Sequence, residues 1–142
     1  MKILVAVDGS EQALAAVRHA LHLKQAGLQA SFVLATVQAP VYGIETMLTP
    51  NAGPFEKMSG VVGARILKSA EALFDAAKVQ FVRDIAFGEP VPALLELVER
   101  HQCDSIIMGA RGMGFMRSAL MGSVADGVLH SSSQVTVTIV KQ

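Results

Sequence analysis

The chain has 142 residues, a length typical of one domain with a single hydrophobic core. Twelve basic residues balance twelve acidic residues and only 17% of the chain is charged, which excludes the basic surface that nucleic-acid binding requires. A single cysteine, Cys103, excludes an internal disulfide and a metal site with two thiolate ligands.

A short apolar run, Ile3 to Val7, opens the chain and is typical of a strand buried on both faces of a parallel sheet. Asp8 interrupts this run before it reaches the length of a secretory signal, and no other apolar run is long enough to span a membrane. We therefore expect a cytoplasmic protein that does not contact a membrane. Ser10 predicts the start of a helix, because its side chain can accept a hydrogen bond from the first turn, and Gly27 predicts its end.

The rest of the chain continues this alternation of strands and helices. Residues 30–37 predict a second strand, and the proline- and glycine-rich residues 38–56 predict a long loop that is a candidate lid. Apolar residues recur every three or four positions from Val62 to Ala77, which predicts an amphipathic helix. The remaining expected elements are a strand at 79–86, a helix at 90–101, a strand at 105–108, a helix that begins after Gly122 and Ser123, and a strand at 135–140. This order predicts an α/β fold, a doubly wound parallel sheet with helices on both faces, in one domain spanning residues 1–142.

Two strand ends carry the residues that point to a binding site. Sheets of this kind bind ligands beyond the carboxyl ends of their strands. The first strand ends at Asp8, and a glycine-rich segment with Arg111 and Arg117 follows the fourth strand. Gly122 and Ser123 then precede a helix, whose N-terminus attracts anions. Glycine turns, arginine side chains and a helix N-terminus together predict a phosphate-binding segment.

A plainer interpretation of the same segment stays open. The glycines would only turn the chain, and Ser123 with Asp126 would only cap the following helix. The concentration of glycines after one strand, together with two arginines, favours the anion site.

The spacing Gly-x2-Gly-x9-Gly-Ser, together with the opening Ile-Leu-Val-Ala-Val-Asp-Gly-Ser, resembles the universal stress protein family, specifically its ATP-binding branch. Gly109, Gly112, Gly122 and Ser123 meet the spacing, and the resemblance covers the whole chain. It implies a five-stranded sheet in the order 3-2-1-4-5, the adenine nucleotide alpha hydrolase-like fold, and a homodimer. One departure is Thr136, where the family often has a proline just before the last strand.

The resemblance also implies roles for individual residues. ATP, AMP or ADP would lie across the ends of strands one and four, with Mg²⁺ as a candidate companion ion. Asp8 and Val37 would recognise adenine and its surroundings, and Gly109 would lie against the ribose. The phosphates would be held by Gly112, Gly122, Ser123 and Val124, and Arg111 is the cation that the sequence itself adds to this set.

Three functions fit these features. The first is a nucleotide-dependent regulatory module of the stress response, which binds ATP or AMP with little or no chemistry. The second is a slow ATPase or phosphotransfer protein, which needs a residue that orients water or an acceptor near the terminal phosphate. The third is a scaffolding dimer without a ligand. The first is favoured because no catalytic residue is evident, and His19 and His22 provide only two of the ligands that a metal site needs.

The last strand predicts self-association. In the order 3-2-1-4-5 the strand at residues 135–140 lies at an edge, and it contains no proline and no charge. Because soluble proteins usually protect such an edge, we expect a second copy to pair with it antiparallel in a homodimer, across a two-fold axis near Val137 or Thr138.

Overall fold

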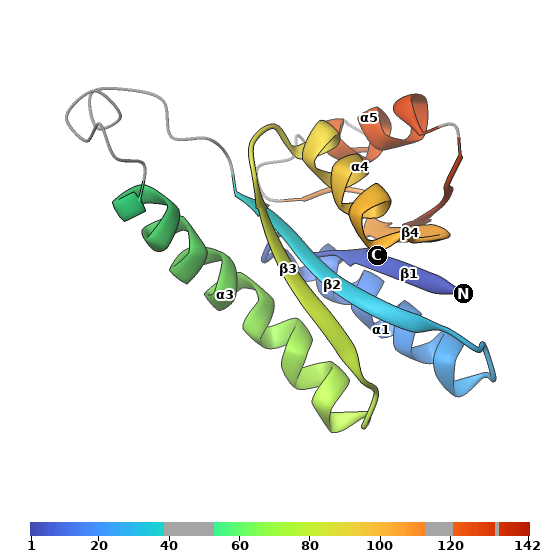
Figure 1. Cartoon of the computed structure of the whole chain (residues 1–142). Helices are drawn as coiled ribbons and strands as arrows, with labels where there is room; N and C mark the ends of the chain where they lie inside the picture. Colours follow the sequence, from blue (N-terminus) through green and yellow to red (C-terminus); the bar gives the residue numbers. More distant parts are fainter. Residues whose placement is uncertain (39–52, 113–120, 133) are drawn as a thin grey trace.

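The computed structural model describes residues 1–38, 53–112, 121–132 and 134–142 (Figure 1). Its five parallel strands form one sheet in the order β3-β2-β1-β4-β5, so the expected fold class and strand order are confirmed. The strands are β1 (Lys2–Ala6), β2 (Ser31–Gln38), β3 (Phe81–Phe87), β4 (Ser105–Gly109) and β5 (Thr136–Val140).

Helices cover both faces of this sheet (Figure 1). On one face, α1 (Glu11–Gln25) and α3 (Gly53–Ala76) bury a cluster that includes Ile3, Val5 and Phe74. On the other face, α4 (Pro90–His101) and α5 (Ser123–Ser131) pack over a second cluster that includes Leu4 and Ile106. Successive residues of β1 therefore serve opposite cores, which is why the strand reads as a continuous apolar run. In the described part of the chain, no helix has the length and apolar character needed to cross a membrane.

Two element boundaries differ from the sequence prediction by more than one residue. The expected loop at 38–56 is too long, because α3 already begins at Gly53, and Pro54 is compatible with the first turn of a helix. The rest of the candidate lid, residues 39–52, lies outside the described residues. The third strand begins at Phe81 and not at Val79, because Lys78 has a positive φ of 56° and the N–H of Val79 still donates to the carbonyl of Phe74. Val79 thus belongs to the turn that follows α3.

The turn between β1 and α1 is built by Asp8 and Ser10. The Ser10 hydroxyl accepts a hydrogen bond from the N–H of Ala13 at 3.1 Å, so the predicted helix cap is confirmed. Oδ1 of Asp8 in turn accepts from the Ser10 N–H (2.9 Å) and from the Ser10 hydroxyl (2.5 Å). Gly9 between them has a φ of +89°, which a residue with a side chain rarely adopts. This chain of bonds fixes the Asp8 carboxylate at the carboxyl edge of the sheet.

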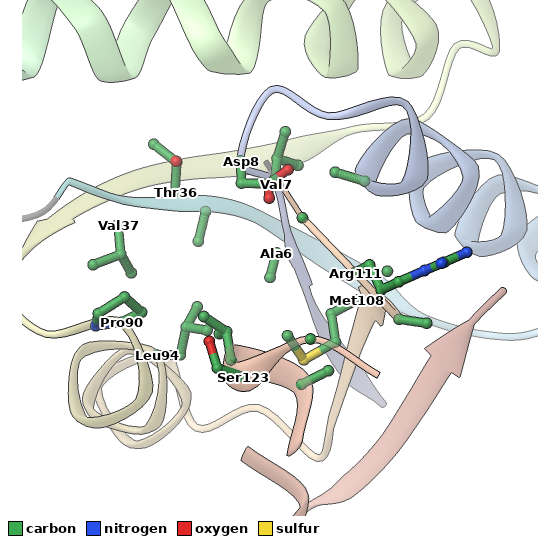
Figure 2. A pocket seen from close by; sticks show the side chains of 18 residues that line it. Ala6, Val7, Asp8, Thr36, Val37, Pro90, Leu94, Met108, Arg111 and Ser123 are labelled. Carbon is green, nitrogen blue, oxygen red and sulfur yellow. The ribbon is translucent and has the colours of Figure 1, made fainter. Parts of the chain in front are cut away.

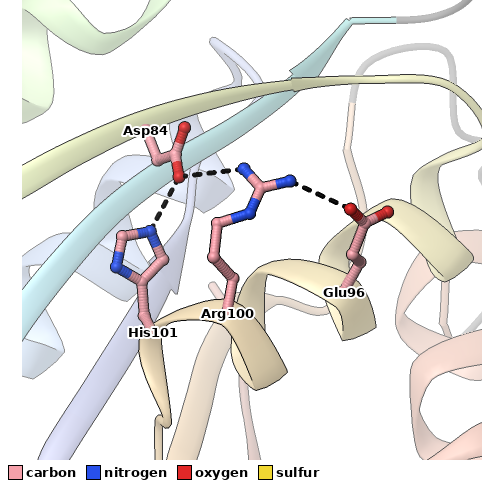
Figure 3. A network of polar contacts seen from close by, with 4 residues as sticks. All are labelled: Asp84, Glu96, Arg100 and His101. Atoms are coloured by element: carbon pink, nitrogen blue, oxygen red, sulfur yellow. Dashed lines mark hydrogen bonds and ion pairs between the residues drawn. The ribbon is translucent and has the colours of Figure 1, made fainter.

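An ionic network connects the C-terminal end of α4 to the edge strand β3 (Figure 3). Oδ2 of Asp84 accepts from Nε2 of His101 at 2.7 Å and from Arg100 at 3.3 Å, and Arg100 also pairs with Glu96 at 2.9 Å. Burial alone would raise the pKa of the Asp84 carboxyl, but the hydrogen bond from His101 and the charges of Arg100 and His101 outweigh it and lower the pKa. The pairing of His101 with a residue of β3, 17 positions earlier in the chain, is a finding of the structure.

The backbone of β5 distinguishes its two edges. Within the described residues, β5 pairs with β4 alone. The N–H of Thr136 donates to the carbonyl of Asp104 at 3.2 Å, on the side of β4. Because successive residues of a strand direct their N–H and C=O groups to opposite sides, Thr138 also faces β4, whereas Val137 and Ile139 face the open edge. Of the two residues expected near the two-fold axis, Val137 therefore has its N–H at the open edge and Thr138 does not.

Candidate functional site

A pocket of about 220 Å³ lies at the carboxyl ends of β1, β2 and β4, between these strand ends and the first turns of α4 and α5 (Figure 2). Such strand ends are the usual ligand-binding position of this sheet architecture. The structure brings all eight residues that the sequence singled out to the wall of this one pocket: Asp8, Val37, Gly109, Arg111, Gly112, Gly122, Ser123 and Val124.

One part of the pocket wall is apolar. Side chains of Val37 on β2 and of Pro90 and Leu94 on α4 lie close together there (Figure 2). The strands beneath contribute small or flexible side chains, including Ala35 and Met108. The first turn of α4 contains Pro90, which has no N–H to offer a ligand. This part of the wall suits a flat apolar group.

The start of α5 forms a polar part of the wall. Gly122 is the N-cap of α5, and its own N–H donates to the carbonyl of Ala110 at 2.6 Å. The first N–H groups of a helix have no acceptor within the helix and form its positive end. Ser123 is exposed and is the first residue of the helix, whereas the N-cap is Gly122, so the interpretation of Ser123 as a mere cap is wrong.

Backbone and side-chain bonds hold the segment after β4 on three sides. The N–H of Ala110 donates to the carbonyl of Val140 on β5 at 2.9 Å, and its carbonyl accepts from Gly122 at the start of α5. The N–H of Arg111 donates to Oε1 of Gln12 on α1 at 2.7 Å. Sequence reasoning missed Gln12, since it lies 99 positions from Arg111 and resembles an ordinary polar residue in the first turn of a helix.

The glycines of the predicted motif sit where the chain passes close to a neighbour. A Cβ atom on Gly112 would overlap Oδ2 of Asp8, and one on Gly109 would lie 3.0 Å from the backbone carbonyl of Gln12. A Cβ atom on Gly122 would lie 3.3 Å from Cα of Arg111. Close packing of the chain therefore accounts for part of the glycine motif, a reason that the sequence interpretation did not include.

The charged side chains of the site are arranged differently from the expectation. The Arg111 side chain runs away from Val37, Leu94 and Ser123 in Figure 2, so its guanidinium group does not join the polar wall in this conformation. Arg117 lies outside the described residues. Asp8 is exposed at the rim, where its carboxylate lies against Gly112. Among the residues that the structure describes, no three His, Cys, Asp or Glu side chains converge as a metal site.

Comparisons with known proteins agree with this architecture. A model of the universal stress protein family matches residues 1–141. A universal stress protein of Methanocaldococcus jannaschii is 26% identical over 99% of this chain and 82% of its own length. A universal stress protein solved in complex with cAMP is 28% identical, with a TM-score of 0.72 over 99% of this chain and 96% of that chain. An Arabidopsis thaliana member of the family, solved with AMP bound, is 18% identical, with a TM-score of 0.67 over 100% of this chain and 92% of that chain. With strand order, pocket and family match in agreement, the chain belongs to the universal stress protein family.

Proposed function

We propose that the chain is a single-domain module that binds an adenine nucleotide, AMP or ATP, in the pocket at the ends of β1 and β4, and that occupancy regulates its interactions in the stress response. The observation that carries the proposal is the meeting of all eight predicted residues, from β1, β2, the segment after β4 and α5, at one pocket. The relative that was solved with cAMP supports a ligand of the same chemical class.

The two parts of the wall suggest how a nucleotide would be oriented. The apolar part at Val37, Pro90 and Leu94 suits the faces of a purine base. The positive end of α5, at Ser123 and Val124, suits a phosphate group. Asp8, between the first strand and Gly112, would accept hydrogen bonds from an amine or hydroxyl of the nucleoside and would repel phosphate.

The hydrogen bonds that Asp8 makes favour a regulatory role over hydrolysis of the nucleotide. Asp8 is the only carboxylate among the described residues that line the pocket. Its Oδ1 already accepts two hydrogen bonds from Ser10, so it is committed to the turn and poorly suited to take a proton from an attacking water. We therefore expect at most weak hydrolysis of ATP.

Titration calorimetry with AMP, with ATP in the presence and absence of Mg²⁺, and with inorganic triphosphate tests the proposal. We expect a Kd for the adenine nucleotides between roughly micromolar and millimolar. Asp8→Ala should weaken AMP and ATP more than inorganic triphosphate, because the carboxylate serves the nucleoside. Gly122→Val should lose binding, because its side chain would push α5 away from Arg111. Gly60→Val, the same change at an open position of α3, is the matched control. Absence of heat and of a thermal shift at millimolar nucleotide would refute the proposal.

We also propose that two copies associate through β5. This strand lies at the edge of the sheet, and its open edge presents the backbone groups of Val137 and Ile139. No charge or proline protects residues 135–140. A two-fold axis lets the same strand pair with its copy and leaves no further edge open at that position, which supports a closed dimer.

A further inference from the structure

Gln12 connects the first turn of α1 to the wall of the pocket without lining the pocket itself. Its Oε1 accepts the N–H of Arg111 at 2.7 Å, in a partly buried position. The backbone of Gln12 also packs closely against the end of β4, because a Cβ atom on Gly109 would lie 3.0 Å from the Gln12 carbonyl. The side chain of Gln12 is thus the α1 anchor of the segment that leads from β4 to Gly112.

The hydrogen bond between Gln12 and Arg111 sets the direction of the backbone after β4. Ala110 is fixed by β5 and by the start of α5, and Arg111 is the next residue along the chain. With its N–H directed to Gln12, the following residue, Gly112, passes directly beside the Asp8 carboxylate. Without that acceptor, the N–H of Arg111 would be left partly buried and without this partner, and the segment would gain other conformations.

We propose that Gln12 is a positioning residue of the nucleotide pocket: it holds Arg111 and Gly112 in the conformation that receives the ligand. The inference rests on the proposed nucleotide function. Loss of a hydrogen bond of this kind shifts the equilibrium between the competent and the other conformations of this segment several-fold, which lowers the fraction of molecules with a competent pocket. The apparent Kd rises by the inverse of that fraction, and it does so equally for every ligand of the pocket.

Three variants separate this role from general stability. Gln12→Met keeps the length and the helix propensity of the side chain but removes the strong acceptor. Gln12→Glu restores an oxygen acceptor at the same distance along the side chain. Gln25→Met makes the same change at an exposed position at the other end of α1 and is the matched control.

Two measurements test the role. The first is amide hydrogen exchange at Arg111 in the protein without nucleotide, which does not depend on the proposed function. The second is calorimetry with adenosine and with AMP. Adenosine carries no phosphate, so it reports the restored acceptor in Gln12→Glu without repulsion between the new carboxylate and a phosphate.

In Gln12→Met we expect faster exchange of the Arg111 amide and a roughly three- to tenfold weaker Kd for adenosine and AMP alike. In Gln12→Glu the protection and the adenosine Kd should return, and Gln25→Met should match the wild type in both measurements. Unchanged exchange at Arg111 in Gln12→Met would overturn the inference, and so would a loss confined to AMP. If the wild type binds neither ligand, the proposed function fails, and with it the role of Gln12 in ligand binding. Faster exchange of the Arg111 amide in Gln12→Met would then still establish that Gln12 anchors the segment.

Discussion

Gly112 and Asp8 are in contact at the rim of the pocket, and no space remains between them for a Cβ atom, which would overlap Oδ2 of Asp8. The same carboxylate uses its other oxygen to accept two hydrogen bonds from Ser10, the cap of α1. The backbone after β4, the end of β1 and the start of α1 therefore depend on one another, although they are far apart in the sequence.

This contact predicts a coupling between two substitutions. Gly112→Ala should lower the free energy of unfolding by about 1 kcal/mol, because Asp8 must rotate away and weaken its bonds to Ser10. In an Asp8→Ala background the overlap is absent, so the same change should cost little. Urea denaturation of the two single variants and the double variant measures the coupling energy. Additive effects would mean that any cost of Gly112→Ala does not come from its contact with Asp8.

Two glycines of α3, three positions apart, should respond in opposite directions. A Cβ atom on Gly60 meets nothing within 4 Å, so Gly60→Ala should raise the free energy of unfolding by about 1 kcal/mol through helix propensity. A Cβ atom on Gly63 would lie 2.8 Å from Cγ2 of Ile85 on β3, so Gly63→Ala should lower it by roughly 1 kcal/mol or more. Denaturant midpoints of both variants test this, and a gain in stability at Gly63 would show that Ile85 shifts freely.

Asp84 should make stability depend on pH in the acid range. The pKa of its carboxyl is lowered from 3.8 in the folded protein by His101 and Arg100, against the effect of burial. The unfolded chain therefore binds the proton more tightly, so the stabilisation is present above the unfolded pKa and is lost as the pH falls through the folded pKa. Asp84→Asn should be less stable than the wild type by about 1 kcal/mol at pH 7. The difference should shrink below about pH 4.

A control for this experiment is Asp75→Asn, which removes one carboxylate charge at an exposed position near the end of α3. Denaturation of the three proteins from pH 3 to pH 7 gives the two differences directly. A constant difference between Asp84→Asn and the wild type over this range would mean that the ionic network at α4 does not stabilise the fold through the charge of Asp84.

The sequence predicted those features that depend on local pattern. The buried run of β1, the Ser10 cap and the glycine spacing identified the elements, their order and the residues that meet at the pocket. The sequence did not predict contacts between residues that are far apart in the chain and belong to no recognisable motif. Gln12 looks like any polar residue of a helix, and its bond to Arg111 depends on how closely α1 approaches the end of β4.

The sequence also did not predict which N–H and C=O groups of β5 face the open edge. Alternation along a strand gives two possible assignments until the hydrogen bonds to the partner strand are known. The structure assigns Thr138 to the side of β4 and Val137 to the open edge. This assignment determines which residue of β5 can test the proposed dimer.

Val137→Pro should disrupt the dimer while the fold is retained. Its N–H faces the open edge, so proline removes a donor to the second copy and leaves the hydrogen bonds between β4 and β5 in place. Thr138→Pro is the matched contrast, because it removes a donor to β4 and should lower the free energy of unfolding. Light scattering should find wild-type dimers and Val137→Pro monomers at micromolar concentration, with circular dichroism unchanged. A wild-type monomer, or a Val137→Pro variant that stays dimeric, would show that β5 does not form the interface.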